Sequence, residues 1–278
     1  MPELNIERPL AMLSKGMQTC LVLDLNILNH FKNYQQTPIQ SRSPQLVGDI
    51  AAIKKILDIP ALFIAAGFAI GEADESYVEA LSQTYEDFLT AELPGYRDAP
   101  NAIPIGRERT RSRQFNSLPE QDQLFFASAQ VALLKIHDIL LFHQTESPEA
   151  KFDMYLEYMD RVADLVPAIE SEIAKHCFFR SPANAQDPFL AQSSSIRANF
   201  DKGGRGEKRV DRILNGARDV MLLRATAMED GKPLDGKIQD TWLLTSDSGL
   251  AALCNSIYFY PAEGERAKFT ATVDSPFR

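Results

Sequence analysis

The sequence is poor in cysteine: its 278 residues contain three, Cys20, Cys177 and Cys254. An odd number of widely spaced cysteines excludes a disulfide framework and a cysteine-based zinc site, and it indicates a reducing compartment. The start of the sequence also lacks the charged segment and apolar segment that make up a secretory signal. We therefore expect a cytoplasmic protein.

Long apolar runs and an excess of positive charge are missing as well. The longest apolar run, residues 60–70, is about half as long as a membrane-spanning helix requires, so no membrane segment is expected. Lysine and arginine number 29 against 38 aspartates and glutamates, a net charge of −9. This balance disfavours nucleic-acid binding by bulk attraction and leaves open a local basic groove or an acidic pocket that gathers cations.

Several common functional motifs do not occur. The sequence has neither the G-x-G-x-x-G fingerprint nor the GxxxxGK[ST] loop, which weakens the reading of a nucleotide-binding α/β module. The four histidines show no metal-ligand spacing and are expected to be structural or exposed. They are His30, His137, His143 and His176.

What is present is an ordinary globular composition, with 45% apolar and 24% charged residues. Nearly continuous apolar runs at residues 19–25 and 241–245 predict strands that are buried on both faces of a parallel sheet. Further strands are predicted at residues 256–260 and 177–179. Residues 268–273 alternate in polarity and predict an edge strand.

Most of the remaining sequence predicts helices, separated by two long loops at residues 94–116 and 180–206. Few strands among many helices predict one α/β domain over residues 1–278, with a helical insertion at about residues 74–175. The helices are expected at residues 45–57, 60–70, 74–89, 119–142, 148–176, 207–228 and 247–255.

Acidic residues follow the two clearest strands. Asp24 ends the first strand and Asp247 follows the strand at residues 241–245. If these strands are parallel neighbours, the two carboxylates meet in one crevice, where they repel each other unless a cation lies between them. Oxygen ligands favour Mg²⁺ or Mn²⁺. The alternative is that Asp247 caps the following helix and that Asp24 and Asn26 form a turn or a cap.

Three segments together resemble the PIN-domain superfamily of metal-dependent nucleases. LVLDLNIL at residues 21–28 resembles the opening strand of that family, and WLLTSDSGLAAL at residues 242–253 resembles its late strand and following helix. ARDVMLLRATAM at residues 217–228 resembles the helix before that strand. The resemblance implies a three-layer fold with a short parallel sheet and helices on both faces. The middle of the chain matches nothing in the family.

The resemblance also implies hydrolysis of RNA phosphodiester bonds with one or two Mg²⁺ or Mn²⁺ ions. A bound metal would polarise the phosphate and activate a water molecule for in-line attack. Asp24, Asp219 and Asp247 would hold the metal. Glu72 is expected as a fourth acid, with Asp74 and Glu79 as alternatives.

Polar and basic residues are expected to contact the RNA. Asn26, Thr245 and Ser246 lie beside the acids, although Ser246 is equally suited to cap the next helix. Two basic segments, residues 107–113 and 202–212, each carry a local charge of +3 and would contact phosphates, unless they form solvated faces. The expected contacts in these segments come from Arg109, Arg111, Lys202, Arg205, Lys208 and Arg209.

Two other functions are compatible with the sequence. A phosphatase of the haloacid-dehalogenase type would use Asp24 as a nucleophile, but it would have a second aspartate where this chain has Asn26. A catalytically degenerate PIN-like scaffold would bind RNA or a protein. In that case the helical insertion would dock a partner or a second copy through side chains that otherwise pack in a core. These are Phe125, Phe126, Tyr155, Tyr158 and Met159.

Overall fold

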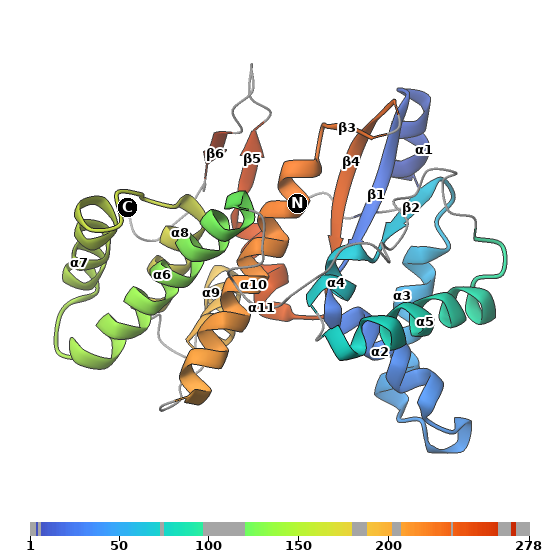
Figure 1. Cartoon of the computed structure of the whole chain (residues 1–278), viewed down its shortest axis with the longest axis horizontal. Helices are drawn as coiled ribbons and strands as arrows, with labels where there is room; N and C mark the ends of the chain where they lie inside the picture. The colour runs from blue at the N-terminus through green and yellow to red at the C-terminus, as the bar shows by residue number, and fades with distance from the viewer. Residues whose placement is uncertain are drawn as a thin grey trace. The chain divides into compact units, whose positions relative to one another are not determined.

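The structure is a computed structural model, and it describes residues 4, 7–72, 75–96, 120–179, 188–201, 207–234, 236–260 and 268–270. The chain divides into two compact units, each with its own hydrophobic core (Figure 1). Unit 1 consists of Met1–Leu118 and Ala225–Ser246, and unit 2 consists of Pro119–Arg224 and Asp247–Arg278. The single domain with an insertion at about residues 74–175 stays a prediction.

Unit 1 contains a sheet with the strand order β2-β1-β4-β3. Strand β1 (Met17–Leu23) is central and pairs in parallel with β2 (Leu62–Ala65) and β4 (Lys237–Leu244), while the short β3 (Pro233–Leu234) runs antiparallel to β4. The last five residues of β1 are buried, so both of its faces are covered, as its continuous apolar sequence predicts. The predicted α/β class, with a parallel sheet assembled from distant segments, is confirmed.

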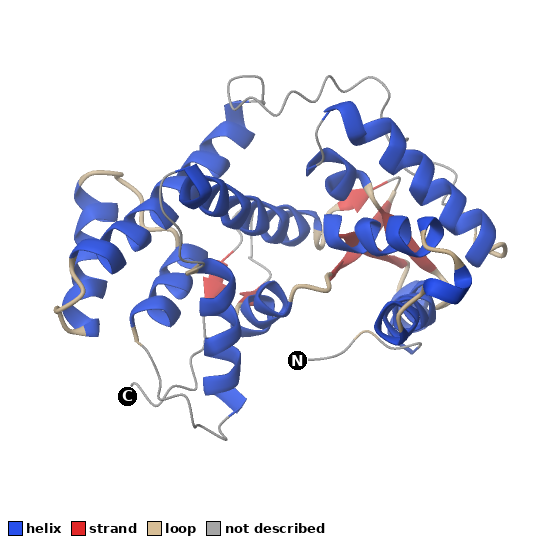
Figure 2. Cartoon of the chain, turned by 90° about the horizontal axis from the view of Figure 1, so that it is seen from below, coloured by secondary structure: helices blue, strands red, loops and turns tan. Residues whose placement is uncertain are grey.

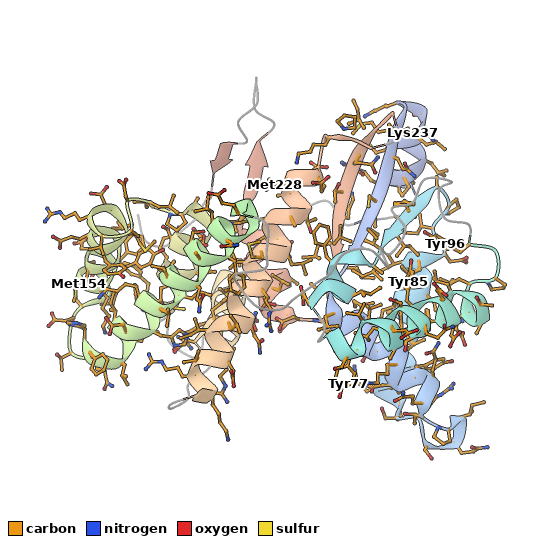
Figure 3. The ribbon with its side chains drawn as sticks, viewed as in Figure 1. Tyr77, Tyr85, Tyr96, Met154, Met228 and Lys237 are labelled. Atoms are coloured by element: carbon orange, nitrogen blue, oxygen red, sulfur yellow. The ribbon has the colours of Figure 1, made fainter. Side chains whose placement is uncertain are left out.

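Helices surround this sheet, as the view from below shows (Figure 2). Phe31 and Phe88 stack in the core with ring centroids 3.8 Å apart. The Ile64 backbone N–H donates at 3.0 Å to the hydroxyl of Tyr96, whose side chain is labelled in Figure 3. The helices of unit 1 are α1 (Glu7–Ser14), α2 (Leu25–Gln36), α3 (Pro44–Leu57), α4 (Gly67–Glu72) and α5 (Glu75–Glu92), with a 3-10 turn, η1, at Ile39–Ser41.

The helix predicted at residues 60–70 is wrong. The segment forms strand β2 followed by α4, and Ala61 before the strand has a φ of 62°. A short, fully apolar run has the same pattern in a buried strand and in a buried helix, so periodicity could not separate them. The segment becomes a strand because it pairs with β1, and this pairing provides hydrogen-bond partners for backbone groups of the central strand.

Unit 2 is mainly helical, and its core includes a buried ion pair. Arg224 donates to both carboxylate oxygens of Glu170, at 2.6 and 2.7 Å, and Glu170 is fully buried. The described elements are α6 (Glu120–Phe142), α7 (Pro148–Arg161), α8 (Ala168–Phe178), α9 (Pro188–Phe200), α10 (Glu207–Glu229, whose last turn belongs to unit 1), α11 (Ser248–Ser256), β5 (Tyr258–Tyr260) and β6 (Lys268–Thr270).

Several predictions in this region are wrong. Residues 148–176 form two helices because Pro167 separates α7 from α8, and residues 177–179 lie at the end of α8 instead of in a strand. The predicted loop at residues 180–206 contains α9. The strands predicted at residues 256–260 and 268–273 are confirmed in part as β5 and β6, which pair antiparallel with each other in a separate sheet. The apolar run at residues 177–179 is only three residues long, which is too short to identify a strand.

Across the described ranges, no helix combines the length and the apolar character needed to cross a membrane.

Candidate functional site

The ends of β1 and β4 meet, and they bring Asp24 to the carboxyl edge of the parallel sheet. Leu23 pairs with Leu244, and the Asp24 backbone N–H donates to the Leu244 carbonyl at 3.0 Å. The Asp24 residue is only 5% exposed. The expectation that the strand carrying Asp24 and the strand before Asp247 are parallel neighbours is therefore confirmed.

The side chains of Asn26 and Thr245 hold the Asp24 carboxylate. The Thr245 hydroxyl donates to Asp24 Oδ2 at 2.5 Å, and Asn26 Nδ2 donates to the same oxygen at 2.6 Å. The other end of the Asn26 amide, Oδ1, accepts the Ser246 backbone N–H at 3.1 Å. Asn26 thus holds the Asp24 carboxylate and also connects the end of β4 to the start of α2. Asp24 itself caps α2 by accepting the Asn26 backbone N–H at 3.4 Å.

Ser246 contacts His30, a histidine that no sequence pattern singled out. Its hydroxyl lies 3.1 Å from His30 Nε2, and His30 Nδ1 lies 3.9 Å from Asp49 Oδ2. Asp247, not Ser246, caps α11, so the capping role considered for Ser246 is wrong. No short motif joins residues 30, 49 and 246. Only the pairing of β4 beside β1 brings Ser246 to α2.

Within unit 2, Asp247 and Asp219 lie near the same pair of helices. Asp247 Oδ1 accepts the backbone N–H groups of Gly249 and Leu250 at 2.7 and 2.9 Å, the capping role that was its alternative reading. Asp219 Oδ2 accepts the Asn199 side-chain amide at 3.0 Å. Asn199 on α9 also packs directly against Gly249 at the start of α11. One asparagine therefore contacts both the acid on α10 and the helix that Asp247 caps.

The three residues considered as the fourth acid, Glu72, Asp74 and Glu79, lie in sequence at or beyond the end of α4 and on α5. Glu72 is half-buried and ends the short helix α4, so the long apolar helix on which its choice rested does not exist. Glu79 is exposed on α5, and Asp74 lies outside the described residues. In the described part of the chain, no three His, Cys, Asp or Glu side chains form a group suited to a metal ion. The metal site stays a prediction.

The oxygen-rich end of the sheet fits the kind of metal that was predicted. The Asp24 carboxylate, the Asn26 amide nitrogen and the Thr245 hydroxyl lie together at the ends of β1 and β4, and the Asn26 amide oxygen accepts the Ser246 backbone N–H. Carboxylate, carbonyl and hydroxyl oxygens are the hard ligands that Mg²⁺ and Mn²⁺ prefer. The oxygen atoms of Asp24 and Thr245 therefore suit such an ion.

The basic residues predicted to bind RNA are only partly described. Lys208 is exposed at the start of α10. Arg209 donates to the backbone carbonyl of His137, so its guanidinium already serves a structural contact. Burial and then the nearby Arg209 charge lower the pKa of His137, which bonds to the Phe200 carbonyl at 2.8 Å. Outside the described residues lie Arg109, Arg111, Lys202 and Arg205.

The aromatic residues of the proposed insertion pack mainly in the core of unit 2. Tyr155 and Met159 are fully buried, and Phe126 and Tyr158 are partly buried against them. The side chain of Phe125 lies outside the described part. These residues support the core reading that the sequence left open, and docking of a partner or second copy stays a prediction.

Comparisons of the chain with protein-family models, with curated proteins and with solved structures found no match.

Proposed function

We propose that this protein is a PIN-like, metal-dependent endoribonuclease that hydrolyses phosphodiester bonds of single-stranded or structured RNA. The observation that carries the proposal is the position of Asp24, a 5% exposed carboxylate at the carboxyl end of the central parallel strand. Ligands of open α/β sheets bind at this edge. Asn26 and Thr245 fix the carboxylate by hydrogen bonds, which preorganises it for one orientation.

The proposal assigns Asp24, Asp219 and Asp247 as metal ligands and Glu72 as a fourth acid. Mg²⁺ or Mn²⁺ bound by them would supply Lewis-acid chemistry to the phosphate and to an attacking water. Asn26 and Thr245 orient Asp24, and Ser246 presents a hydroxyl beside it for a phosphate oxygen. RNA would reach the site along the basic segments that include Arg109, Arg111, Lys202, Arg205, Lys208 and Arg209.

Chain connectivity supports the role of Asp247. Thr245 contacts Asp24, and Asp247 is the second residue after Thr245. Two Cα–Cα steps of about 3.8 Å limit the separation of the Thr245 and Asp247 Cα atoms to about 7.6 Å. Asp219 is supported by Asn199, which bonds to Asp219 and packs on the helix that Asp247 caps.

The test compares wild type with Asp24→Asn on labelled single-stranded RNA in the presence of Mn²⁺. Asp153→Asn is a matched control, because Asp153 is an exposed aspartate on α7. We expect cleavage by wild type and by the control, loss of at least 100-fold in Asp24→Asn, and loss in EDTA. Equal cleavage by wild type and Asp24→Asn would refute the assignment of Asp24.

The same proteins separate the other two functions. A haloacid-dehalogenase-type phosphatase would form an acyl-phosphate on Asp24 and release phosphate from a monoester. A degenerate scaffold would bind RNA or a protein partner without cleaving RNA under any metal. Asn26 favours the nuclease, because its amide bonds to Asp24 where the phosphatase class carries a second acid.

A further inference from the structure

A pocket lies next to the Asp24 site, and we propose that it is the subsite for a nucleotide of the single-stranded RNA being cleaved. In this reading His30 and Ser246 contact the phosphate, and the pocket takes the nucleoside attached to it. The inference rests on the proposed nuclease function. The pocket would hold the nucleotide that lies directly beside the cleaved phosphodiester bond.

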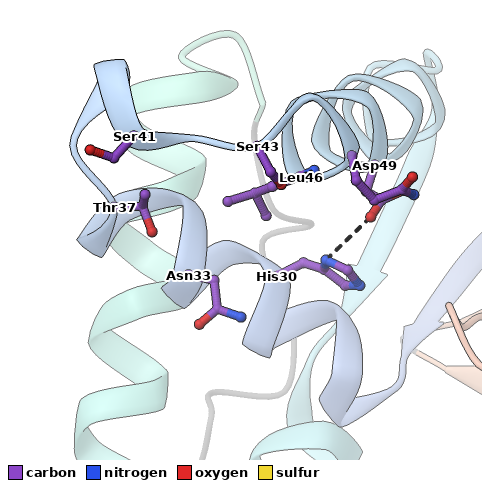
Figure 4. A pocket seen from close by; sticks show the side chains of 8 residues that line it. His30, Asn33, Thr37, Ser41, Ser43, Leu46 and Asp49 are labelled. Atoms are coloured by element: carbon purple, nitrogen blue, oxygen red, sulfur yellow. Dashed lines mark hydrogen bonds and ion pairs between the residues drawn. The ribbon is translucent and has the colours of Figure 1, made fainter.

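The pocket lies between α2, η1 and α3 in unit 1 (Figure 4). His30 and Asp49 face each other across one end of it, and its volume is about 390 Å³, within the range of small-molecule pockets. The rest of the wall combines amide and hydroxyl groups with apolar surface, which is the larger part. It is formed by Asn33, Thr37, Ser41, Ser43, Gln45 and Leu46.

A chain of direct contacts connects this pocket to Asp24. His30 Nε2 lies 3.1 Å from the Ser246 hydroxyl, and the Ser246 backbone N–H donates to Asn26 Oδ1 at 3.1 Å. Asn26 in turn donates to Asp24 at 2.6 Å. Three hydrogen bonds therefore connect the pocket wall at His30 to the Asp24 carboxylate through Ser246 and Asn26.

The contacts of His30 orient its ring toward Ser246. Asp49 faces Nδ1, and Asp49 is held in turn by Gln45 Nε2 at 2.8 Å from its Oδ1. The imidazole tautomer with its hydrogen on Nε2 donates to the Ser246 hydroxyl oxygen. The Ser246 hydroxyl then keeps its own proton for an anionic oxygen. A phosphodiester supplies such an oxygen.

The composition of the wall favours a nucleoside as the second part of the ligand. Asn33 and Gln45 carry both donors and acceptors, as hydrogen bonding to a base edge requires. Proteins read single-stranded RNA through such contacts to bases that are not paired. A purely anionic ligand would instead need several cations, whereas this wall contains a carboxylate, Asp49.

The experiment measures binding without cleavage, by fluorescence anisotropy of a labelled single-stranded oligoribonucleotide in EDTA. The test variants are His30→Gln and Asn33→Ala. The matched controls are His143→Gln, a half-buried histidine after α6, and Asn255→Ala, an exposed asparagine on α11. We expect each pocket variant to weaken binding about 5- to 10-fold, the loss of a hydrogen bond to a charged or polar partner, and the controls to stay within 2-fold.

A second measurement locates the ligand directly. The protein has four histidines, so the imidazole signals in a ¹H–¹³C spectrum can be assigned with His30→Gln and His143→Gln. Added oligoribonucleotide should shift the His30 signal and leave the His143 signal in place. An oligodeoxyribonucleotide that shifts His30 equally would show that the subsite accepts both sugars.

The inference is overturned if the pocket variants bind RNA as wild type does, if RNA binds without moving the His30 signal, or if no RNA binds. Failure of the nuclease proposal looks different. In that case Mn²⁺ produces no Asp24-dependent cleavage, while RNA still binds with the His30 shift, and the pocket remains a nucleotide site.

Discussion

The Thr245 hydroxyl donates to Asp24 Oδ2 at 2.5 Å, which joins the residue after β4 to the residue after β1. Thr245 comes 221 positions after Asp24, yet the parallel register of the two strands places them side by side. The polar end of the sheet therefore depends on the pairing of the first strand with one near the end of the chain.

Replacing Thr245 tests how much this contact stabilises the fold. Thr245→Val keeps the shape and removes the donor from a buried carboxylate, which should lower the free energy of unfolding by about 1.5–3 kcal/mol. Thr245→Ser retains the hydroxyl and should cost less. Urea unfolding of the three proteins measures the difference, and equal stability of the Val and Ser variants would show that the bond contributes nothing.

Asn26 should contribute more to the stability of the fold than Asn29 on the same helix. Its side chain donates to Asp24 and accepts from Ser246, so Asn26→Ala removes two connections and should destabilise the protein by about 2–3 kcal/mol. Asn29→Ala is the control, because Asn29 is exposed on α2, and its effect should stay within about 0.5 kcal/mol. Thermal or urea unfolding gives both values. Similar losses in the two variants would contradict the assigned role.

Asp240 should make stability depend on pH. Burial raises its pKa, but hydrogen bonds from Arg8 and Trp242 outweigh burial and leave the pKa below its ordinary value. A folded pKa below the unfolded value of about 3.9 means that the stabilisation is complete above that pH and is lost as pH falls through the folded pKa. Asp240→Asn should therefore be less stable than wild type at pH 7, by about 1–3 kcal/mol.

The difference in the free energy of unfolding between wild type and Asp240→Asn should narrow below about pH 4. The Asp240 carboxylate takes up a proton there in the unfolded protein before it does so in the folded protein. Urea unfolding from pH 7 down to pH 3 follows this difference. A difference that stays constant over this range would exclude Asp240 as the titrating group.

Gly249 and Gly48 form a matched pair for backbone packing. A Cβ on Gly249 would lie 2.4 Å from Asn199 Cβ and 2.7 Å from the Ser195 carbonyl oxygen, so Gly249→Ala should destabilise by about 1–3 kcal/mol. Under the proposed nuclease function, the variant should also reduce RNA cleavage, because Asn199 bonds to Asp219. Gly48 in α3 has open space around it, and Gly48→Ala should stabilise by about 0.5–1 kcal/mol. Opposite signs in thermal unfolding are the expected result.

Removing one partner of the buried pair of Arg224 and Glu170 should lower the free energy of unfolding much more than replacing both partners by apolar residues. Arg224→Met leaves a fully buried carboxylate without its bidentate partner and should destabilise by about 3–5 kcal/mol. The double variant Arg224→Met with Glu170→Leu should recover most of that loss, because it removes both charges. A double-mutant cycle measured by urea unfolding tests this, and simple additivity would contradict it.

Local patterns in the sequence were sufficient to predict the strands β1 and β4 and the helices α3, α10 and α11. Each of these elements was predicted from helical periodicity, from a continuous apolar run or from its position directly after a strand. These patterns depend only on neighbouring residues. The same patterns also predicted that Asp24 ends a buried strand and that Asp247 starts a helix. Those assignments follow from residue type and local position, without knowledge of the partners.

The contact of Asp24 with Thr245 follows from the three-dimensional arrangement of distant segments. The run at residues 60–70 became a strand because it pairs with β1, a contact that no local pattern encodes. His30, Asp49 and Ser246 come together because β4 lies beside β1, more than 200 residues away from it in sequence. Contacts between distant segments depend on register and packing across the whole sheet, so the spacing of residues in one sequence does not reveal them.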